Sequence, residues 1–222
     1  MTDPAAHLAD ATLDEIRAAL APAVAANAAF DGWSADARTL AARDAGVDAD
    51  VAALALPDPL TMIDAWFAAI DAVMLATLPP ERLGAMKVRA RIAALVEARI
   101  DAIAPHRESL RRARAILALP QHVARAARLG WRTADTIWRA AGDTATDYNH
   151  YSKRTILLGV YAATMTVLLD DDSPGQADTR AFLARRIEGI MRFERAKAGM
   201  LRRTRHRPSL ARFVGRLRYP VT

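Results

Sequence analysis

The segment WRTADTIWRAAGDTATDYNHYSKR, residues 131–154, holds two tryptophans, two tyrosines and a histidine among many charges, around one Gly-Asp break. A helix that only fills a core does not need this mixture. Aromatic side chains supply contact area and charged side chains set register, so the composition is typical of a recognition surface. Trp131 and Trp138, seven residues apart, lie on one helix face, where such a pair most often belongs to a core. The segment therefore predicts two helices joined by a break, with a surface role and a core role both open.

The rest of the chain also predicts helices, because strand-type alternation is rare and alanine, the best helix former, is abundant. Thr12 followed by Glu15 is a capping-box pattern that opens a helix to about residue 27. Ser34 and Asp48 are N-cap residues for two short helices that end near residues 46 and 56. Longer helices are expected at 60–78, 81–104, 108–119, 120–141, 147–169 and from the Ser173-Pro174 pair onward, with an Arg-rich link after Gly199. This helix order resembles that of TetR-type regulators, so the predicted fold class is all-α: a TetR-like bundle of about nine helices plus a C-terminal amphipathic helix.

The sequence lacks the residues and motifs that several kinds of functional site require. The 222 residues contain no cysteine, which excludes disulfides, and no glycine-rich nucleotide loop or HExxH zinc motif. The five histidines are not spaced as metal ligands, so we expect no catalytic residue, no metal and no cofactor, with an enzyme kept as an alternative class. The longest uncharged apolar run, 155–169, is shorter than the roughly 20 residues that a membrane span needs.

The charge of the head disfavours DNA binding. A recognition helix meets phosphates with basic or polar side chains. The candidate helix that begins after Asp48 also contains Asp50 and has no basic residue. We therefore expect no nucleic-acid partner, and a ligand-responsive TetR-type transcriptional repressor is the alternative function.

The positive charge of the chain is concentrated at its C-terminus. Residues 192–222 contain ten Lys or Arg and one acid, so the rest of the chain is mildly acidic although the whole carries +6. Apolar residues at i, i+3, i+4 and i+7 form one stripe beside these arginines, which is typical of an amphipathic helix on an anionic membrane surface. The membrane-binding residues expected are Arg202, Arg203, Arg205, Arg207, Leu210, Arg212, Phe213, Val214, Arg216 and Leu217. The alternative is a solvated basic terminus whose helix folds back on the body.

These patterns divide the chain into three expected regions: a three-helix, degenerate helix-turn-helix head at 1–58, a helical bundle at 59–199 and a basic amphipathic tail at 200–222. Residues 1–10 carry acids and lack the apolar stretch of a signal peptide. Nearly all basic residues are arginine, which hints at a GC-rich bacterial genome. The expected location is the bacterial cytoplasm, peripheral on the inner membrane.

Three stretches carry a resemblance to a known family: the segment 131–154, AFDGWS at 29–34, and DDSPG with FLARRIEGIMRFE between residues 171 and 194. They are similar to the ubiquinone-biosynthesis accessory family known as the ninth coenzyme-Q protein, and the resemblance covers nearly the whole chain. It implies a TetR-like, non-catalytic homodimer that pairs through residues 147–169 and 173–194. It also implies that the bundle binds an isoprenoid lipid or a phospholipid and that the tail attaches to a membrane.

The resemblance further implies a protein partner, the di-iron demethoxyubiquinone hydroxylase or an equivalent quinone hydroxylase. The expected function is to bind isoprenoid quinone intermediates and to present them to this enzyme at the membrane. The partner-binding residues that the resemblance implies are Ile137, Asp147, Asn149, His150, Tyr151 and Arg154. His150 stands where some relatives have tryptophan, which reduces the aromatic area of this contact.

Overall fold

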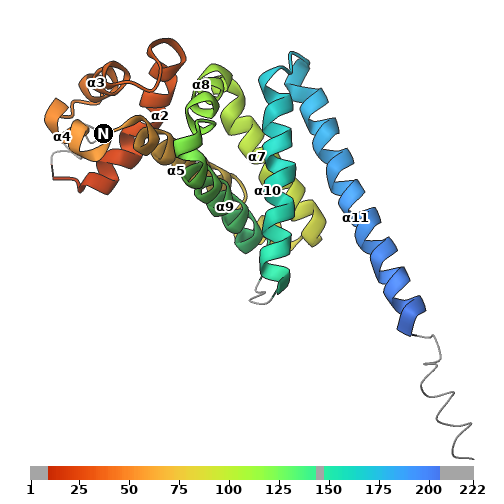
Figure 1. Ribbon diagram of the computed structural model, residues 1–222. Helices are drawn as coiled ribbons and strands as arrows, with labels where there is room; N and C mark the ends of the chain where they lie inside the picture. Colours follow the sequence, from red (N-terminus) through yellow and green to blue (C-terminus); the bar gives the residue numbers. More distant parts are fainter. Residues whose placement is uncertain (1–9, 144–147, 206–222) are drawn as a thin grey trace, which may run out of the picture. The chain divides into compact units, whose positions relative to one another are not determined.

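The computed structural model describes residues 10–143 and 148–205, and within these ranges every long regular element is a helix (Figure 1). The predicted all-α class is confirmed. The contacts divide the chain into two compact units, and the boundary along the sequence lies between Leu183 and Ala184. The helices are α2 (Leu13–Asp31), α3 (Ala35–Asp44), α4 (Ala49–Ala55), α5 (Pro59–Thr77), α6 (Pro80–Gly84), α7 (Val88–Ile103), α8 (Arg107–Leu117), α9 (Val123–Ala140), α10 (Tyr148–Leu169) and α11 (Ala177–Arg205), with short 3₁₀ turns η1 (Ala104–His106), η2 (Pro120–His122) and η3 (Pro174–Gln176).

The three N-terminal helices begin where their capping residues predict. The Thr12 hydroxyl accepts a hydrogen bond from the Glu15 amide at 3.3 Å, and the Glu15 carboxylate accepts one from the Thr12 amide at 2.8 Å. Ser34 and Asp48 cap α3 and α4 in the same way. However, α2 runs to Asp31, past the expected end near residue 27, and stops at Gly32, whose φ of 71° suits glycine.

The first helix is joined to the bundle by buried tryptophans. The Trp33 indole donates to the Ser109 carbonyl at 3.0 Å, and the Ser109 hydroxyl donates to the Ala25 carbonyl at 2.6 Å. The ring centroids of Trp33 and Trp66 are 5.4 Å apart. The Trp33 indole and the Ser109 hydroxyl thus have hydrogen-bond partners, as buried polar groups require. Around them α2, α5 and α8 pack into one largely apolar core.

The central helix of this core is α5, which contacts α2, α7, α8 and α9. Within the described residues it is the helix whose length and composition would also allow it to cross a membrane. Its buried residues include Met62, Ile63, Trp66 and Asp71. Such a residue set fits the core helix of a bundle, where a buried acid is held by a partner from another helix.

The helix expected at 81–104 is instead two helices, α6 and α7, with a break at residues 85–87. Arg91 stabilises this break by donating to the Met86 carbonyl at 2.9 Å and the Gly84 carbonyl at 3.4 Å. A further donation, to the Ala141 carbonyl at 2.9 Å, ties the break to the end of α9. The backbone carbonyls at the break therefore accept hydrogen bonds from a side chain. The local periodicity of the sequence did not indicate this break.

The expectations for the last long helix need two corrections. The Ser173-Pro174 pair opens the turn η3, in which Gly175 has a φ of 62°, and α11 begins only at Ala177. The helix then continues through Gly199 to Arg205, where an Arg-rich link was expected. One glycine costs a helix only about 1 kcal/mol, which a long run of good helix formers tolerates. The remainder of the tail lies outside the described residues.

Candidate functional site

Three aromatic rings form a cluster between the middle of α9 and the start of α10. The Trp131 ring centroid lies 6.0 Å from that of Tyr151 and 6.3 Å from that of His150, and the last two are 5.1 Å apart. Tyr151 is 61% exposed, whereas Trp131 and His150 are half-buried. We call Trp131, His150 and Tyr151 the aromatic cluster; exposed aromatic area of this kind is what a protein partner can cover.

Charged residues hold the start of α10 against α9 directly beside the aromatic cluster. Arg154 is 1% exposed and donates to Asp135 at 2.6 Å, to Asp143 at 3.1 Å and to the His150 carbonyl at 3.1 Å. Lys153 pairs with the other oxygen of Asp143 at 2.7 Å. Although its burial acts in the opposite direction, the hydrogen bonds from Lys153 and Arg154 lower the pKa of Asp143 below its ordinary value. We call Arg154, Asp135, Asp143 and Lys153 the ion network.

Trp138 completes the link between these two helices. Its indole donates to the Lys153 carbonyl at 3.1 Å, and the Lys153 ammonium lies 5.2 Å from its ring centroid. The two tryptophans of the 131–154 segment therefore have different roles: Trp131 belongs to the aromatic cluster, and Trp138 packs behind it.

The structure separates the residues that were expected to bind a partner. Tyr151 and His150 lie in the aromatic cluster, but Ile137 and Arg154 are buried within the bundle. Asp147 and the side chain of Asn149 lie outside the described residues. Arg154 therefore positions the surface and does not present its side chain on it. Trp131 was missing from the expected set, and the spacing of the two tryptophans could not have added it, because the same spacing applies to Trp138.

The expected membrane-binding residues are described only in part. Arg202, Arg203 and Arg205 belong to α11, and their side chains are not described. The other expected residues, Arg207, Leu210, Arg212, Phe213, Val214, Arg216 and Leu217, lie outside the described residues. Binding of these residues to a membrane surface stays a prediction.

A cavity of about 160 Å³ lies within the bundle, between α5, α7, α8, α9 and α10. Its wall is mostly apolar and includes Phe67, Leu110, Leu129, Leu158 and Met165. Gly130 on α9 also lines it, and a Cβ added there would stand 2.4 Å from a methyl carbon of Leu158. The sequence did not indicate which residues line this cavity, because they come from five separate helices.

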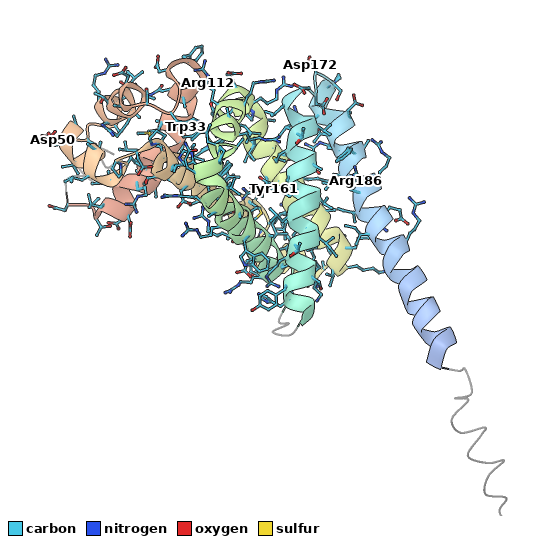
Figure 2. All side chains as sticks on the ribbon, in the orientation of Figure 1. Trp33, Asp50, Arg112, Tyr161, Asp172 and Arg186 are labelled. Carbon is cyan, nitrogen blue, oxygen red and sulfur yellow. The ribbon has the colours of Figure 1, made fainter. Side chains whose placement is uncertain are left out.

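Four polar side chains line the cavity: Arg99, Arg114, Thr133 and Tyr161, the last labelled on α10 in Figure 2. Arg99 is fully buried, donates to the Tyr161 hydroxyl at 3.1 Å and forms an ion pair with Asp71. Burial raises the pKa of Asp71 above its ordinary value, although Arg99 and Arg132 act against this shift. The lining of the cavity is thus mostly apolar and includes two arginines.

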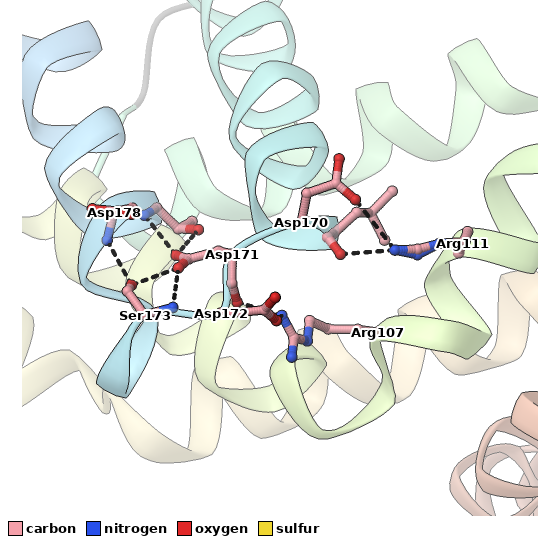
Figure 3. Close-up of polar contacts among 9 residues, drawn as sticks. Arg107, Arg111, Asp170, Asp171, Asp172, Ser173 and Asp178 are labelled. Carbon is pink, nitrogen blue, oxygen red and sulfur yellow. Dashed lines mark hydrogen bonds and ion pairs between the residues drawn. The ribbon is translucent and has the colours of Figure 1, made fainter.

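The turn between α10 and α11 is built from three consecutive aspartates (Figure 3). Asp171 accepts from the Ser173 and Thr179 hydroxyls, at 2.5 Å each, and from the Thr179 amide at 2.8 Å. Although burial acts the other way, these bonds lower the pKa of Asp171 far below its ordinary value. Its neighbours Asp170 and Asp172 pair with Arg111 and Arg107 of α8, each at 3.3 Å. This part of the DDSPG motif therefore has a structural role, as the cap of α11.

Among the described residues, no three His, Asp or Glu side chains lie close enough together to hold a metal ion.

Comparison with known proteins finds a family match over the helices that carry the aromatic cluster. Residues 123–194, which span α9, α10 and the first part of α11, match the model of the COQ9 family. Ubiquinone biosynthesis protein COQ9, mitochondrial, from Rattus norvegicus is 32% identical over 167 residues, which are 72% of this chain and 54% of the rat protein. The Homo sapiens protein of the same name is 36% identical over 43% of this chain and 30% of its own length. The Drosophila melanogaster protein is 26% identical over 87% of this chain and 60% of its own.

The chain spans about half the length of the curated relatives that it matches. A TetR transcriptional regulator from Nitrosomonas europaea has a similar structure, with a TM-score of 0.63 and 22% identity over 78% of this chain and 97% of its own. The expected resemblance to the COQ9 family and the TetR-like fold are thereby confirmed.

One expectation is overturned by these relatives. The chain was expected in the bacterial cytoplasm, peripheral on an inner membrane. Every relative named here carries the word mitochondrial in its name, so that expectation was wrong and the relatives point to mitochondria. Its premise was weak in physical terms, because a preference for arginine over lysine carries no information about compartment.

Proposed function

From the resemblance to the COQ9 family, we propose that this chain is a non-catalytic, lipid-binding accessory protein of ubiquinone biosynthesis. The match over residues 123–194 is the observation that carries the proposal. Those residues form part of the lining of the apolar cavity and the whole of the aromatic cluster, so the matched segment contributes to both features on which the proposal rests. In this proposal the chain binds isoprenoid quinone intermediates and presents them to the hydroxylase that acts on demethoxyubiquinone.

The cavity supports the lipid-binding part. An engineered apolar cavity of about 150 Å³ holds a molecule the size of benzene. The present cavity, at about 160 Å³, therefore accommodates one ring or a short length of chain. A longer polyprenyl tail requires the surrounding helices to move apart, so the ring end of the ligand enters first.

The aromatic cluster supports the partner-binding part. Its Tyr151 is exposed, and the ion network beneath fixes the backbone on which Tyr151 and His150 stand. A rigid surface loses little conformational entropy when a partner covers it. In this proposal the hydroxylase docks there, and the basic residues 200–222 hold the complex on an anionic membrane surface. The chain pairs as a homodimer through residues 147–169 and 173–194.

Lipid binding is tested by incubating the full chain with a membrane lipid extract and recording native mass spectra. We expect retained mass that corresponds to an isoprenoid lipid or a phospholipid. A spectrum that contains only the protein would refute the lipid-binding role.

Membrane binding is tested by flotation with vesicles that contain anionic lipid, using the full chain and a chain that ends at residue 199. We expect the full chain to float at low salt and to be released by high salt, because the attraction is electrostatic. Equal partition of the two chains would refute a role for the tail.

A further inference from the structure

Two guanidinium groups that line the cavity each have one buried nitrogen without a hydrogen-bond partner. In Arg99, Nε donates to Tyr161 and Nη1 pairs with Asp71, but Nη2 has no acceptor within the described residues. In Arg114, Nη2 donates to the Thr166 hydroxyl at 2.9 Å, while Nη1 has no acceptor there either. Buried donors without partners are rare in native proteins, because each costs about 1–3 kcal/mol. Two of them at one cavity point to a ligand that supplies acceptors.

The charge at the cavity tells what kind of acceptor it favours. Asp71 balances Arg99. Arg114 contacts the neutral Thr166 and forms no ion pair within the described part of the chain. The charge of Arg114, whose side chain is half-buried, therefore has no counter-charge within the described part of the chain. A ligand oxygen that carries negative charge gains both a charge-assisted hydrogen bond and the balance of this charge.

The volume of the cavity limits the rest of the ligand. About 160 Å³ accepts a single six-membered ring, so a longer chain attached to the ring would have to extend beyond this space. Phe67, Leu129 and Met165 are apolar residues of the same lining and offer the ring its apolar contacts.

We propose that this cavity binds a ring that bears an anionic oxygen, a carboxylate or a phenolate, through Arg99 Nη2 and Arg114 Nη1. The proposal rests on the proposed lipid-binding function, since it identifies the ring end that enters the bundle. The same ring chemistry has two sources, the head group of a prenylated lipid or a free ring acid.

The test is isothermal titration of the full chain with benzoate, benzyl alcohol and 4-octylbenzoate. Benzyl alcohol has nearly the size of benzoate without its charge, so we expect it to bind at least tenfold more weakly. Tighter binding of 4-octylbenzoate than of benzoate identifies the lipid as the source, and the reverse order identifies the free acid. Binding of benzyl alcohol as tight as that of benzoate would overturn the proposal, as would a lack of binding by all three compounds.

Variants assign the binding to the two arginines. Arg114→Met removes one donor and the unbalanced charge, so we expect affinity for benzoate to fall about tenfold or more. Arg112→Met is the matched control on the same helix, because Arg112 pairs with Glu108 at 3.0 Å and does not line the cavity. We expect it to leave the affinity unchanged. Equal losses in the two variants would overturn the assignment.

Arg99 needs a different design, because its removal alone leaves Asp71 charged and buried. The double variant Asp71→Leu/Arg99→Met removes both charges together, an exchange that buried ion pairs often tolerate. We expect this variant to fold and to bind benzoate at least tenfold more weakly; unchanged affinity would remove Arg99 from the site. If the wild-type chain retains lipid from a membrane extract but ignores benzoate, this inference fails while the proposed lipid-binding function stands.

Discussion

Replacing Arg154 with methionine tests whether the ion network holds α10 in place. Removing one partner of a buried ion pair costs about 3–5 kcal/mol, because the other charge is left without compensation. Here Asp143 keeps Lys153 and Asp135 keeps Arg139, at 2.7 Å each, so we expect the lower end, about 3 kcal/mol. For a chain of this length 1 kcal/mol corresponds to a change in Tm of about 2–4 °C. The expected fall in Tm is therefore about 6–12 °C.

The assay is thermal unfolding followed by circular dichroism at pH 7, with Arg139→Met as the matched control. Arg139 pairs with the same Asp135, but its side chain is 72% exposed, so its removal costs at most about 1 kcal/mol. If Arg154→Met lowers Tm no more than Arg139→Met, the buried network does not stabilise the start of α10, and the reasoning is refuted.

The same variant makes a prediction about pH. Because the pKa of Asp143 is lowered in the folded chain, its contribution to stability is complete above its ordinary value of 3.8 and is lost as pH falls below that value. Without Arg154 the lowering is weaker, so protonation of Asp143 in the folded state begins at a higher pH. The midpoint of acid unfolding should therefore move to higher pH in Arg154→Met. A midpoint that stays in place would indicate that Lys153 alone sets this pKa.

Three further changes have defined outcomes. Asp171→Asn should cost about 1–2 kcal/mol at pH 7 by weakening the cap of α11, and urea unfolding should show the difference from wild type shrinking below pH 4, because the stability from a lowered carboxyl pKa is lost as pH falls. Gly130→Ala should cost about 1–3 kcal/mol by crowding the facing leucine of α10, whereas Gly159→Ala, where a Cβ has open space, should be neutral or stabilising in the same calorimetric scan. Trp33→Phe should lower stability by about 1–3 kcal/mol in denaturant titration, because it removes the indole hydrogen bond to the Ser109 carbonyl of α8 and leaves a smaller ring in a buried position; a neutral result would mean that the core closes around the smaller ring.

The sequence predicts those parts of the fold that depend on neighbouring residues. A cap is such a part: Thr12, Ser34 and Asp48 each bond to an amide two or three residues away, so the pattern and the structure agree. The break between α6 and α7 is different. It depends on Arg91 reaching the Ala141 carbonyl, 50 residues along the chain, and no local pattern contains that contact.

The candidate site follows the same division. In the sequence Asp71 lies in a mostly apolar segment, and Arg99 is flanked by the apolar pairs Leu95-Val96 and Ile100-Ile103. Each of these patterns is compatible with a buried charge that needs a partner. Only the packing of α5 against α7 makes them partners. The sequence likewise gathered Arg154 with the exposed aromatics, since all lie within residues 131–154. The sequence does not show that the Arg154 side chain is buried, because its burial depends on the packing of α10 against α9.

Fold and function separate most clearly in the N-terminal head. The structural similarity to a TetR regulator describes how the helices are arranged, and at 22% identity it carries nothing about what they bind. At α4 the first free amides would be the donors for a DNA phosphate. Here the Asp48 carboxylate already accepts from the amides of Asp50 and Val51, at 2.9 and 3.2 Å, and adds its own negative charge beside that of Asp50. A phosphate would have to displace this cap and approach two carboxylates at once. The start of α4 therefore disfavours a phosphate, and the helix order shared with a repressor does not by itself assign DNA binding to this head.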